Sequence, residues 1–347
     1  MTSSETNSES SILAQAHSNI ALIKYWGKRD EDLKLPQNGS ISLTLDALWT
    51  RTRVTYTEST GPDQLWLNGQ MAPESQRIKV QRFLDLLRPP KTQSSQRFLG
   101  AALIESENNF PTGAGLASSA SGFAALALAA TAAAGRECSR AELSQLARQG
   151  SGSACRSLFG GFVEWQRGEA ADGADSFALP IDEKPDWQLC MAVLVLNDLP
   201  KALSSGDGMA QTVATSPLYP AWLASIEADL AQMRQAIAAR DLTALGELME
   251  HNALKMHATA LASRPAVIYW QPLTLELLAR IRELRHSGLE CYATIDAGPN
   301  LKVLMSERDW PRFQTALADW YELKALIPCR PGPGAFIVPN TSAEQMP

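Results

Sequence analysis

Cysteine and histidine are scarce in this sequence, and neither forms a recognisable chemical motif. The five cysteines are an odd, scattered set without a CxxC pair. They argue against a disulfide framework and fit a reducing, cytoplasmic compartment. The four histidines form no HExxH pattern, so the residues give little support for a zinc site.

An excess of positive charge is also missing. Lys and Arg number 31 against 37 Asp and Glu, a net charge of −6, whereas a nucleic-acid binder carries a basic excess. This argues against nucleic-acid and membrane-surface partners but leaves room for a local basic pocket for an anionic small molecule. Residues 1–13 lack the basic and apolar regions of a signal peptide. Because this segment begins with many Ser and Glu residues, we expect it to be a disordered tail.

One long segment without charge requires a test for membrane insertion. No charged residue lies between Glu107 and Arg136, a length that could cross a bilayer. The segment consists mostly of Ala, Ser, Gly and Thr, which insert poorly into membranes. We therefore expect a soluble protein with an Ala-rich helix at this place.

Strand and helix patterns occur in two successive blocks. Residues 41–57 alternate apolar and polar as half-buried strands do, and Ser139 with Glu142 forms a capping box for a helix. The mostly apolar residues 187–196 predict a strand buried on both faces, and 217–287 are largely helical. Strands followed by helices, twice, predict an α+β protein of two packed lobes. Further strands are expected at 65–70, 98–105, 160–166, 335–338 and twice within 291–305, and further helices at 75–88, 308–320 and up to Gly135.

Four segments could carry chemistry, and the first is PTGAGLASSASG at 111–122. Glycines let the backbone approach a ligand closely, and the N–H groups at a helix N-terminus face an anion. Serine hydroxyls add donors for phosphate oxygens or a ligand for Mg²⁺. The segment lacks the lysine of a P-loop. A small-residue turn before a tightly packed Ala helix explains the composition equally well.

Two further segments each place one charged side chain among small residues. In SGSACRS, 151–157, Arg156 offers a planar fork for a carboxylate or phosphate, although a loop arginine paired with a surface acid is the simpler interpretation. In TIDAGPN, 294–300, Asp296 follows an apolar strand, where a carboxylate can be aimed rigidly into a cleft. The simpler interpretation of Asp296 is the start of an Asx turn at Gly298.

The last segment, NIALIKYWGKRD at 19–30, contains two lysines four residues apart. Lys24 and Lys28 would project to one side in a helix and also in an extended segment. An edge strand with solvated lysines fits as well. Together, however, two Gly/Ser cradles, a lysine pair, one arginine and one rigid aspartate indicate a phosphoryl-transfer site.

These segments resemble the diphosphomevalonate decarboxylase family, a branch of the GHMP small-molecule kinase superfamily. The resemblance extends from about Ala14 to Ile337, and KYWGK together with SGSACRS separates this branch from other GHMP kinases. The matching segments, in the family's order, are NIALIKYWGKRD with LPQNGSISLTL, NNFPTGAGLASSASGFAAL, GSGSACRSLFGGFVEW, NALKMHATALAS and IDAGPNLKVL.

The resemblance implies a two-lobed α+β fold of the GHMP-kinase type. Residues 14–186 would form a lobe like domain 2 of ribosomal protein S5, and residues 187–340 a ferredoxin-like lobe, with the active cleft between them. The implied enzyme is a homodimer that uses MgATP to phosphorylate the 3-hydroxyl of (R)-5-diphosphomevalonate. Elimination of phosphate and CO₂ then leaves isopentenyl diphosphate, a step of isoprenoid biosynthesis in the mevalonate pathway.

The resemblance also implies residue roles. Asp296 would orient or deprotonate the 3-hydroxyl, Arg156 would hold the substrate carboxylate, and Lys24 would lie near the reacting oxygens. Mg²⁺ would be bound by Ser118 or Ser119. The 5-diphosphate would be held by Tyr25, Lys28, Ser151, Gly152 and Ser153. The ATP phosphates would be cradled by Gly113, Gly115, Leu116, Ala117, Ser118 and Ser119.

Two positions depart from the family pattern. Gly206, in SSGDGM, stands where some members, particularly bacterial ones, have an arginine that contacts the distal phosphate, so decarboxylation of mevalonate 5-phosphate is an alternative. Gly39 replaces a residue that is usually serine, with little consequence expected. A kinase that does not decarboxylate and a binding protein with a decayed site are further alternatives. The presence of both Arg156 and Asp296 argues against these two.

Overall fold

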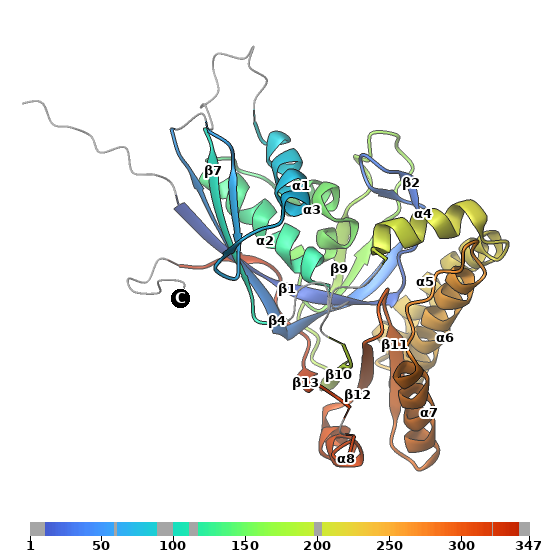
Figure 1. The fold of residues 1–347 in the computed structure, drawn as a ribbon. Helices are drawn as coiled ribbons and strands as arrows, with labels where there is room; N and C mark the ends of the chain where they lie inside the picture. The colour runs from blue at the N-terminus through green and yellow to red at the C-terminus, as the bar shows by residue number, and fades with distance from the viewer. Residues whose placement is uncertain are drawn as a thin grey trace, which may run out of the picture.

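Two β-sheets form the framework of the protein, one in each half of the chain (Figure 1). The computed structural model describes residues 11–58, 61–88, 100–110, 117–197, 203–320 and 322–339. The larger sheet has the order β14-β1-β4-β7-β5-β6, with β8 and β9 attached beside β4. Its strands are β1 (Ser11–Ile23), β4 (Ser40–Tyr56), β5 (Gln64–Leu67), β6 (Gln70–Met71), β7 (Ala102–Asn108), β8 (Phe162–Trp165), β9 (Ala178–Asp182) and β14 (Phe336–Ile337).

Three helices cover one face of this sheet: α1 (Glu74–Asp85), α2 (Ser118–Ala133) and α3 (Arg140–Gly150) (Figure 1). The many alanines of α2 are buried, and their small size lets the helix lie close to β1 and β4. The predicted capping box is confirmed, because Ser139 Oγ accepts from the N–H of Glu142 and Glu142 accepts from the N–H of Ser139. A short hairpin of β2 (Lys28–Asp30) and β3 (Leu35–Pro36) and the 3₁₀-helix η1 (Gly152–Leu158) complete this half.

The second sheet is antiparallel and has the order β11-β12-β10-β13. Along the chain, a helical layer separates β10 from β11, and α8 separates β12 from β13. This strand–helix–strand–strand–helix–strand succession is that of a ferredoxin-like unit. Its elements are β10 (Leu189–Val195), α4 (Ser205–Thr215), α5 (Tyr219–Ala239), α6 (Leu242–Leu261), α7 (Pro272–His286), β11 (Cys291–Ile295), β12 (Leu301–Ser306), η2 (Glu307–Asp309), α8 (Trp310–Ala316) and β13 (Ala325–Cys329).

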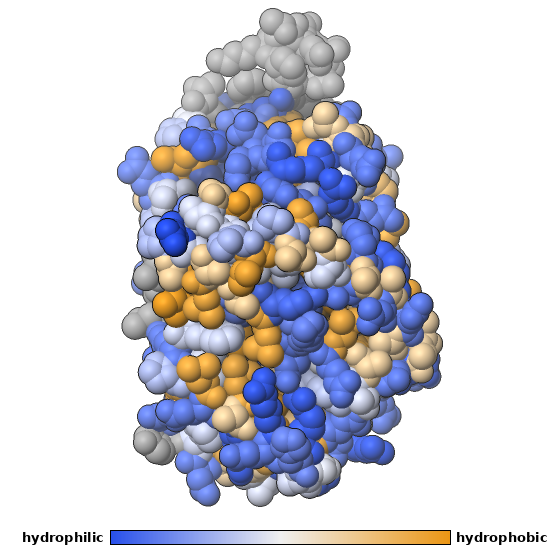
Figure 2. Space-filling model, turned by 90° about the vertical axis from the view of Figure 1, so that its right-hand side faces the viewer, coloured by the Kyte–Doolittle hydropathy of each residue, from blue (hydrophilic) through white to orange (hydrophobic). Residues whose placement is uncertain are grey.

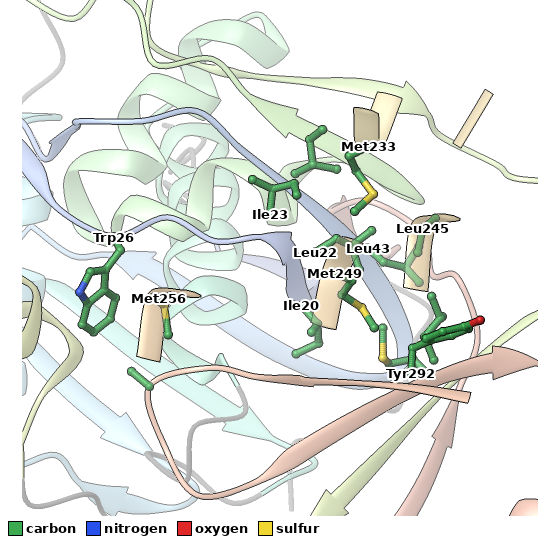
Figure 3. Close-up of a cluster of buried hydrophobic side chains, with 14 of the residues drawn as sticks. Ile20, Leu22, Ile23, Trp26, Leu43, Met233, Leu245, Met249, Met256 and Tyr292 are labelled. Carbon is green, nitrogen blue, oxygen red and sulfur yellow. The ribbon is translucent and has the colours of Figure 1, made fainter. Parts of the chain in front are cut away.

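A core of aliphatic, aromatic and methionine side chains joins the two halves. Figure 3 shows Met233 of α5 on the side of Ile23 of β1, Met249 of α6 near Ile20 of β1, and Tyr292 of β11 at the edge of the cluster. Both α5 and α6 contact β1, and α6 also packs against β11 and β12 of the second sheet. The C-terminal end of β1 is therefore held between the two halves.

The structure corrects several sequence-based expectations. Ser11–Leu13, expected to belong to a tail at residues 1–13, instead pair with β4 as the start of β1, while residues 1–10 lie outside the described residues. The range 187–340 is not one unit, because β14 returns to the larger sheet and pairs with β1. The helix expected at 308–320 is confined to Trp310–Ala316 after a 3₁₀ turn. Strand β13 and helix α4 have weak sequence signals and were not predicted.

The surface formed by α4–α7 mixes hydrophilic and apolar residues (Figure 2). None of the helices in the described ranges combines the length and the apolarity needed to cross a membrane. The Ala-rich segment tested above forms α2, whose alanines pack inside the first half of the protein.

The contact between α6 and β11 yields a stability prediction. A Cβ atom on Gly246 of α6 would lie 2.0 Å from Cδ2 of Tyr292, so Gly246→Ala should lower the free energy of unfolding by about 1–3 kcal/mol. In α2, a Cβ on Gly122 meets nothing within 4 Å, so Gly122→Ala should raise it by up to about 1 kcal/mol. Urea unfolding of both variants tests the difference in sign, and two changes of the same sign would contradict it.

Candidate active site

A pocket of about 440 Å³ lies where the two halves of the protein meet. It contains every predicted site residue that the structure describes; Gly113, Gly115 and Leu116 lie outside the described residues. The lining residues are Asn19, Ala21, Lys24, Tyr25, Trp26, Lys28, Lys34, Lys79, Ala117, Ser118, Ser119, Ser151, Gly152, Ser153, Arg156, Ser204, Ser205, Gly206, Met209, Met256, Asp296 and Ala297.

Asp296 is held by two buried lysines. Lys24 Nζ lies 2.6 Å from Asp296 Oδ1, and Lys302 Nζ lies 3.1 Å from Oδ2. Burial by itself would raise the pKa of Asp296, but the two ammonium groups outweigh it and hold that pKa well below its usual value. The carboxylate is a quarter exposed, toward the pocket. The expected Asx turn is not formed, because Gly298 N–H donates to the backbone carbonyl of Asp296.

Lys24 is fixed at its backbone and at its ammonium group. It follows the last residue of β1, and its N–H donates to Asn252 Oδ1 at 2.8 Å, while its carbonyl accepts from Asn38 Nδ2 at 2.8 Å. Its Nζ also donates to the carbonyl of Ala21 at 2.9 Å. The side chain is only 2% exposed, and burial lowers the pKa of Lys24 while Asp296 opposes that shift. Lys24 is therefore not one of the solvated lysines of an edge strand.

Arg156 is a buried cation that pairs with hydroxyl and amide oxygens. Its Nε donates to Asn19 Oδ1 at 3.1 Å and to Ser42 Oγ at 3.0 Å, and its Nη1 donates to Ser40 Oγ at 2.5 Å. No acidic side chain in the described ranges forms an ion pair with it, which overturns the interpretation as a surface ion pair. Because a buried charge without a counter-ion is costly, this guanidinium is suited to an anionic ligand.

Tyr25 and Gly152 form a tight contact on the pocket wall. The Tyr25 ring packs edge-on against Trp165 with 4.7 Å between centroids, and burial raises the pKa of Tyr25 far above its usual value. A Cβ on Gly152 would lie 2.9 Å from Tyr25 Cε1, so only glycine fits this approach. Lys28 Nζ pairs with Glu31 at 2.5 Å, and a Cβ on Gly206 would lie 3.9 Å from that ammonium group.

The N-terminus of α2 opens into the same pocket. Ala117 precedes the helix with φ of 61°, an uncommon conformation for a residue with a Cβ. Ser119 Oγ lies 3.2 Å from Ser151 Oγ, so the two Gly/Ser segments of the sequence meet here. The positive end of the helix dipole at this place favours an anion.

A second, mainly apolar pocket of about 280 Å³ adjoins the first and shares Lys79, Ser118 and Ser119 with it. Its apolar wall consists of Leu65, Leu67, Val80, Ile104, Phe123 and Leu126. Lys79 Nζ lies 4.8 Å from the centroid of the Phe123 ring. An apolar pocket that leads to a helix N-terminus and a lysine can accept a nucleotide, with its base in the apolar part.

Several residues of the site were not predicted from the sequence. Some of them have a sequence pattern that could have identified them, and others have none. Lys302 interrupts a buried apolar run, LKVLM, which is itself a signal for function. Ser40 and Ser42 are two residues apart on β4 and therefore share the face that meets Arg156. Asn252 begins NALKMHATALAS, one of the segments that carry the family resemblance, but nothing in the sequence relates it to Lys24.

The chain resembles known proteins along both of its halves. Residues 16–178 match the diphosphomevalonate decarboxylase-like N-terminal domain, and residues 191–330 match the mevalonate 5-diphosphate decarboxylase C-terminal domain. The diphosphomevalonate decarboxylase of Ganoderma lucidum is 42% identical over 304 residues, which cover 83% of this chain and 76% of that protein.

Solved structures give the same result. A mevalonate diphosphate decarboxylase from Enterococcus faecalis, described in a study of ATP binding mediated by mevalonate diphosphate, has a TM-score of 0.85 and 44% identity and covers 94% of this chain and 98% of its own. A complex with MVAPP, AMPPCP and magnesium has a TM-score of 0.86 and 45% identity, with the same coverage. The expected two-lobed α+β fold is thereby confirmed. This chain belongs to the diphosphomevalonate decarboxylase family.

Proposed function

We propose that this protein converts (R)-5-diphosphomevalonate and ATP to isopentenyl diphosphate, ADP, phosphate and CO₂. The observation that carries the proposal is one pocket that holds both a carboxylate fixed by two lysines and a buried arginine that pairs with no acid of the described ranges. The related complex with MVAPP, AMPPCP and magnesium supports it. We further propose lobes that divide near residue 186, a homodimeric assembly and a cytoplasmic location.

The nucleotide would occupy the two adjoining pockets. Lys79 and the start of α2, from Ala117 to Ser119, would hold its phosphates. No three His, Cys, Asp or Glu side chains within the described ranges converge to bind a metal. Mg²⁺ would therefore be held by phosphate oxygens and a hydroxyl of Ser118 or Ser119, in keeping with its preference for few protein ligands. When bound, MgATP supplies the phosphoryl group that makes the tertiary 3-hydroxyl a leaving group.

Asp296 would orient the 3-hydroxyl by accepting its hydrogen bond. Its lowered pKa keeps it ionised but makes it a weak base, which suits phosphoryl transfer, where positioning matters more than early proton removal. Lys24 would offset the negative charge that accumulates on the transferring group. Lys302 contacts the far oxygen of Asp296 and would keep the carboxylate fixed.

Arg156 would bind the substrate carboxylate in the elimination step. As the C3–O bond breaks, positive charge grows at C3 and the C1–C2 electron pair moves to form the alkene as CO₂ leaves. A planar guanidinium can fix the C1–C2 bond roughly antiperiplanar to the breaking C3–O bond of the departing phosphate. Its existing hydrogen bonds to Asn19, Ser40 and Ser42 limit its hold on the carboxylate, so losing that charge in the transition state is not made costly.

The 5-diphosphate would lie toward Tyr25, Lys28 and the start of η1. Ser151, Gly152 and Ser153 line that part of the pocket, and Asn19 Nδ2 holds the Ser153 carbonyl at 3.1 Å. Gly206 lies near Lys28, since a Cβ on it would be 3.9 Å from Lys28 Nζ, and the lack of a side chain there would leave room for the second phosphate.

The proposed function is tested by incubating the purified protein with MgATP and (R)-mevalonate 5-diphosphate and measuring ADP and CO₂ together. Equimolar release is expected, with kcat/KM for the diphosphate exceeding that for mevalonate 5-phosphate. ADP without CO₂ would show a kinase that does not decarboxylate. A preference for the monophosphate would overturn the assignment of the substrate.

The role of Asp296 predicts the result of a conservative substitution. Asp296→Asn keeps the shape of the side chain but removes the charge that holds Lys24 and Lys302 and orients the hydroxyl. We expect folding and ATP binding to be largely retained while kcat falls by roughly 10²-fold or more. Steady-state kinetics with circular dichroism as a folding control measures this, and a kcat near that of the wild type would refute the role.

If Arg156 binds the substrate carboxylate, the same substitution, arginine to lysine, should lower activity at this position but not at an exposed arginine. Arg156→Lys replaces a buried planar fork by a point charge and should lower kcat/KM by roughly 10²-fold. Arg234→Lys is the matched control, because Arg234 forms an exposed pair with Glu164 through two hydrogen bonds of 2.8 Å. Equal activity of the two variants would remove Arg156 from the site.

The contact of Lys302 with Asp296 predicts that removal of this lysine changes the pH dependence of kcat/KM. Asp296 is active when ionised, so activity is lost as pH falls through its pKa. Lys302→Met removes one of the two cations that lower this pKa, and the acidic limb of kcat/KM should move to higher pH by about one unit or more. Ionisation of the substrate is common to both enzymes, so the difference belongs to the protein. An unchanged acidic limb would contradict the assignment.

A further inference from the structure

A chain of buried hydrogen bonds runs from the helical layer of the second half to the backbone of Lys24. Asn252 of α6 is fully buried, and its Oδ1 accepts from the Lys24 N–H at 2.8 Å. Its Nδ2 donates to Asp229 Oδ2 of α5 at 2.7 Å. Asp229 also accepts from Lys255 Nζ at 2.5 Å, and Lys255 Nζ donates in addition to Ser225 Oγ at 2.9 Å.

The chemistry of these groups fixes the orientation of the Asn252 amide. A carboxylate only accepts hydrogen bonds, so the donor nitrogen of Asn252 must face Asp229, and this directs Oδ1 toward Lys24. The ion pair with Lys255 compensates the buried charge of Asp229. Asn252 shares its helix face with Met249 and Met256, and Figure 3 shows Met249 of this face close to the β1 residues Ile20 and Leu22.

We propose that Asn252 and Asp229 are positioning residues that set the place of the Lys24 ammonium group relative to Asp296. This inference rests on the proposed function for its catalytic consequence, although the hydrogen-bond relay itself does not. Lys24 lies after the end of β1, and its N–H is held by a side chain from the other half of the protein. The relay therefore links the packing of α5 and α6 to the distance between Lys24 Nζ and the reacting oxygens.

The test uses Asn252→Leu, which nearly preserves the shape of the side chain but removes both hydrogen bonds. We expect kcat to fall roughly 10- to 100-fold with little change in KM for either substrate, because the groups proposed to bind diphosphate and nucleotide are untouched. Hydrogen exchange at the Lys24 amide should also become faster, and this readout does not depend on any activity. Asp229→Asn is the milder variant and should show both effects to a smaller degree.

Glu250→Gln provides the matched control on the same helix. Glu250 is buried, and its carboxylate accepts from the N–H of Ala293 on β11 at 3.0 Å and pairs with Arg285 at 2.6 Å. This variant weakens a comparable buried contact without touching Lys24. Exchange at the Ala293 amide should become faster, while the Lys24 amide and kcat stay close to their wild-type values.

The results of these experiments distinguish three claims: the hydrogen-bond relay, its positioning role and the proposed function. Unchanged exchange at Lys24 in Asn252→Leu would overturn the relay. Faster exchange with unchanged kcat, or a kcat loss matched by Glu250→Gln, would overturn the positioning role. Wild-type protein that releases no ADP or CO₂ from the diphosphate substrate would overturn the proposed function, while the exchange result would still decide whether the relay exists.

Discussion

The site depends on an excess of buried positive charge around one carboxylate. Lys24, Lys302 and Arg156 are each no more than 2% exposed, and Asp296 is the acid that faces the first two. Burying cations without equal negative charge is costly, so the fold must supply the compensation that the side chains lack. A ligand with several negative charges would complete the balance, and diphosphomevalonate with ATP is such a combination.

The fold meets this cost by fixing the cations with neutral oxygens. Arg156 donates to two serines of β4 and to Asn19 of β1, and the Lys24 ammonium group donates to the carbonyl of Ala21. The backbone of Lys24 is fixed in addition by Asn38 and Asn252. These partners come from both halves of the chain, which meet across a shared core. The protein's own contacts therefore fix the charged groups, which is the condition for electrostatic stabilisation of a transition state without reorganisation.

The parts of the structure that could be predicted from sequence are those with local causes. The capping box at Ser139, the buried strand β10 and the alternation along β4 follow from spacing alone. Arg156 and Asp296 were identifiable because a single charge among small residues is unusual. Their simpler interpretations were wrong for a physical reason, since the burial and the long-range partners that exclude them depend on the tertiary fold. The return of β14 to the first sheet and the contact of Asn252 with Lys24 join residues far apart in sequence and leave no local pattern.

The central claim is that the 3-oxygen of the substrate leaves as part of phosphate after it has been phosphorylated in this cationic pocket. The most direct measurement uses diphosphomevalonate labelled with ¹⁸O in the 3-hydroxyl group and determines the isotope content of the released inorganic phosphate by mass spectrometry. The account predicts one labelled oxygen in each phosphate formed together with CO₂. Phosphate free of the label would show that ATP is cleaved by water and that the hydroxyl leaves by another route, which would contradict the account.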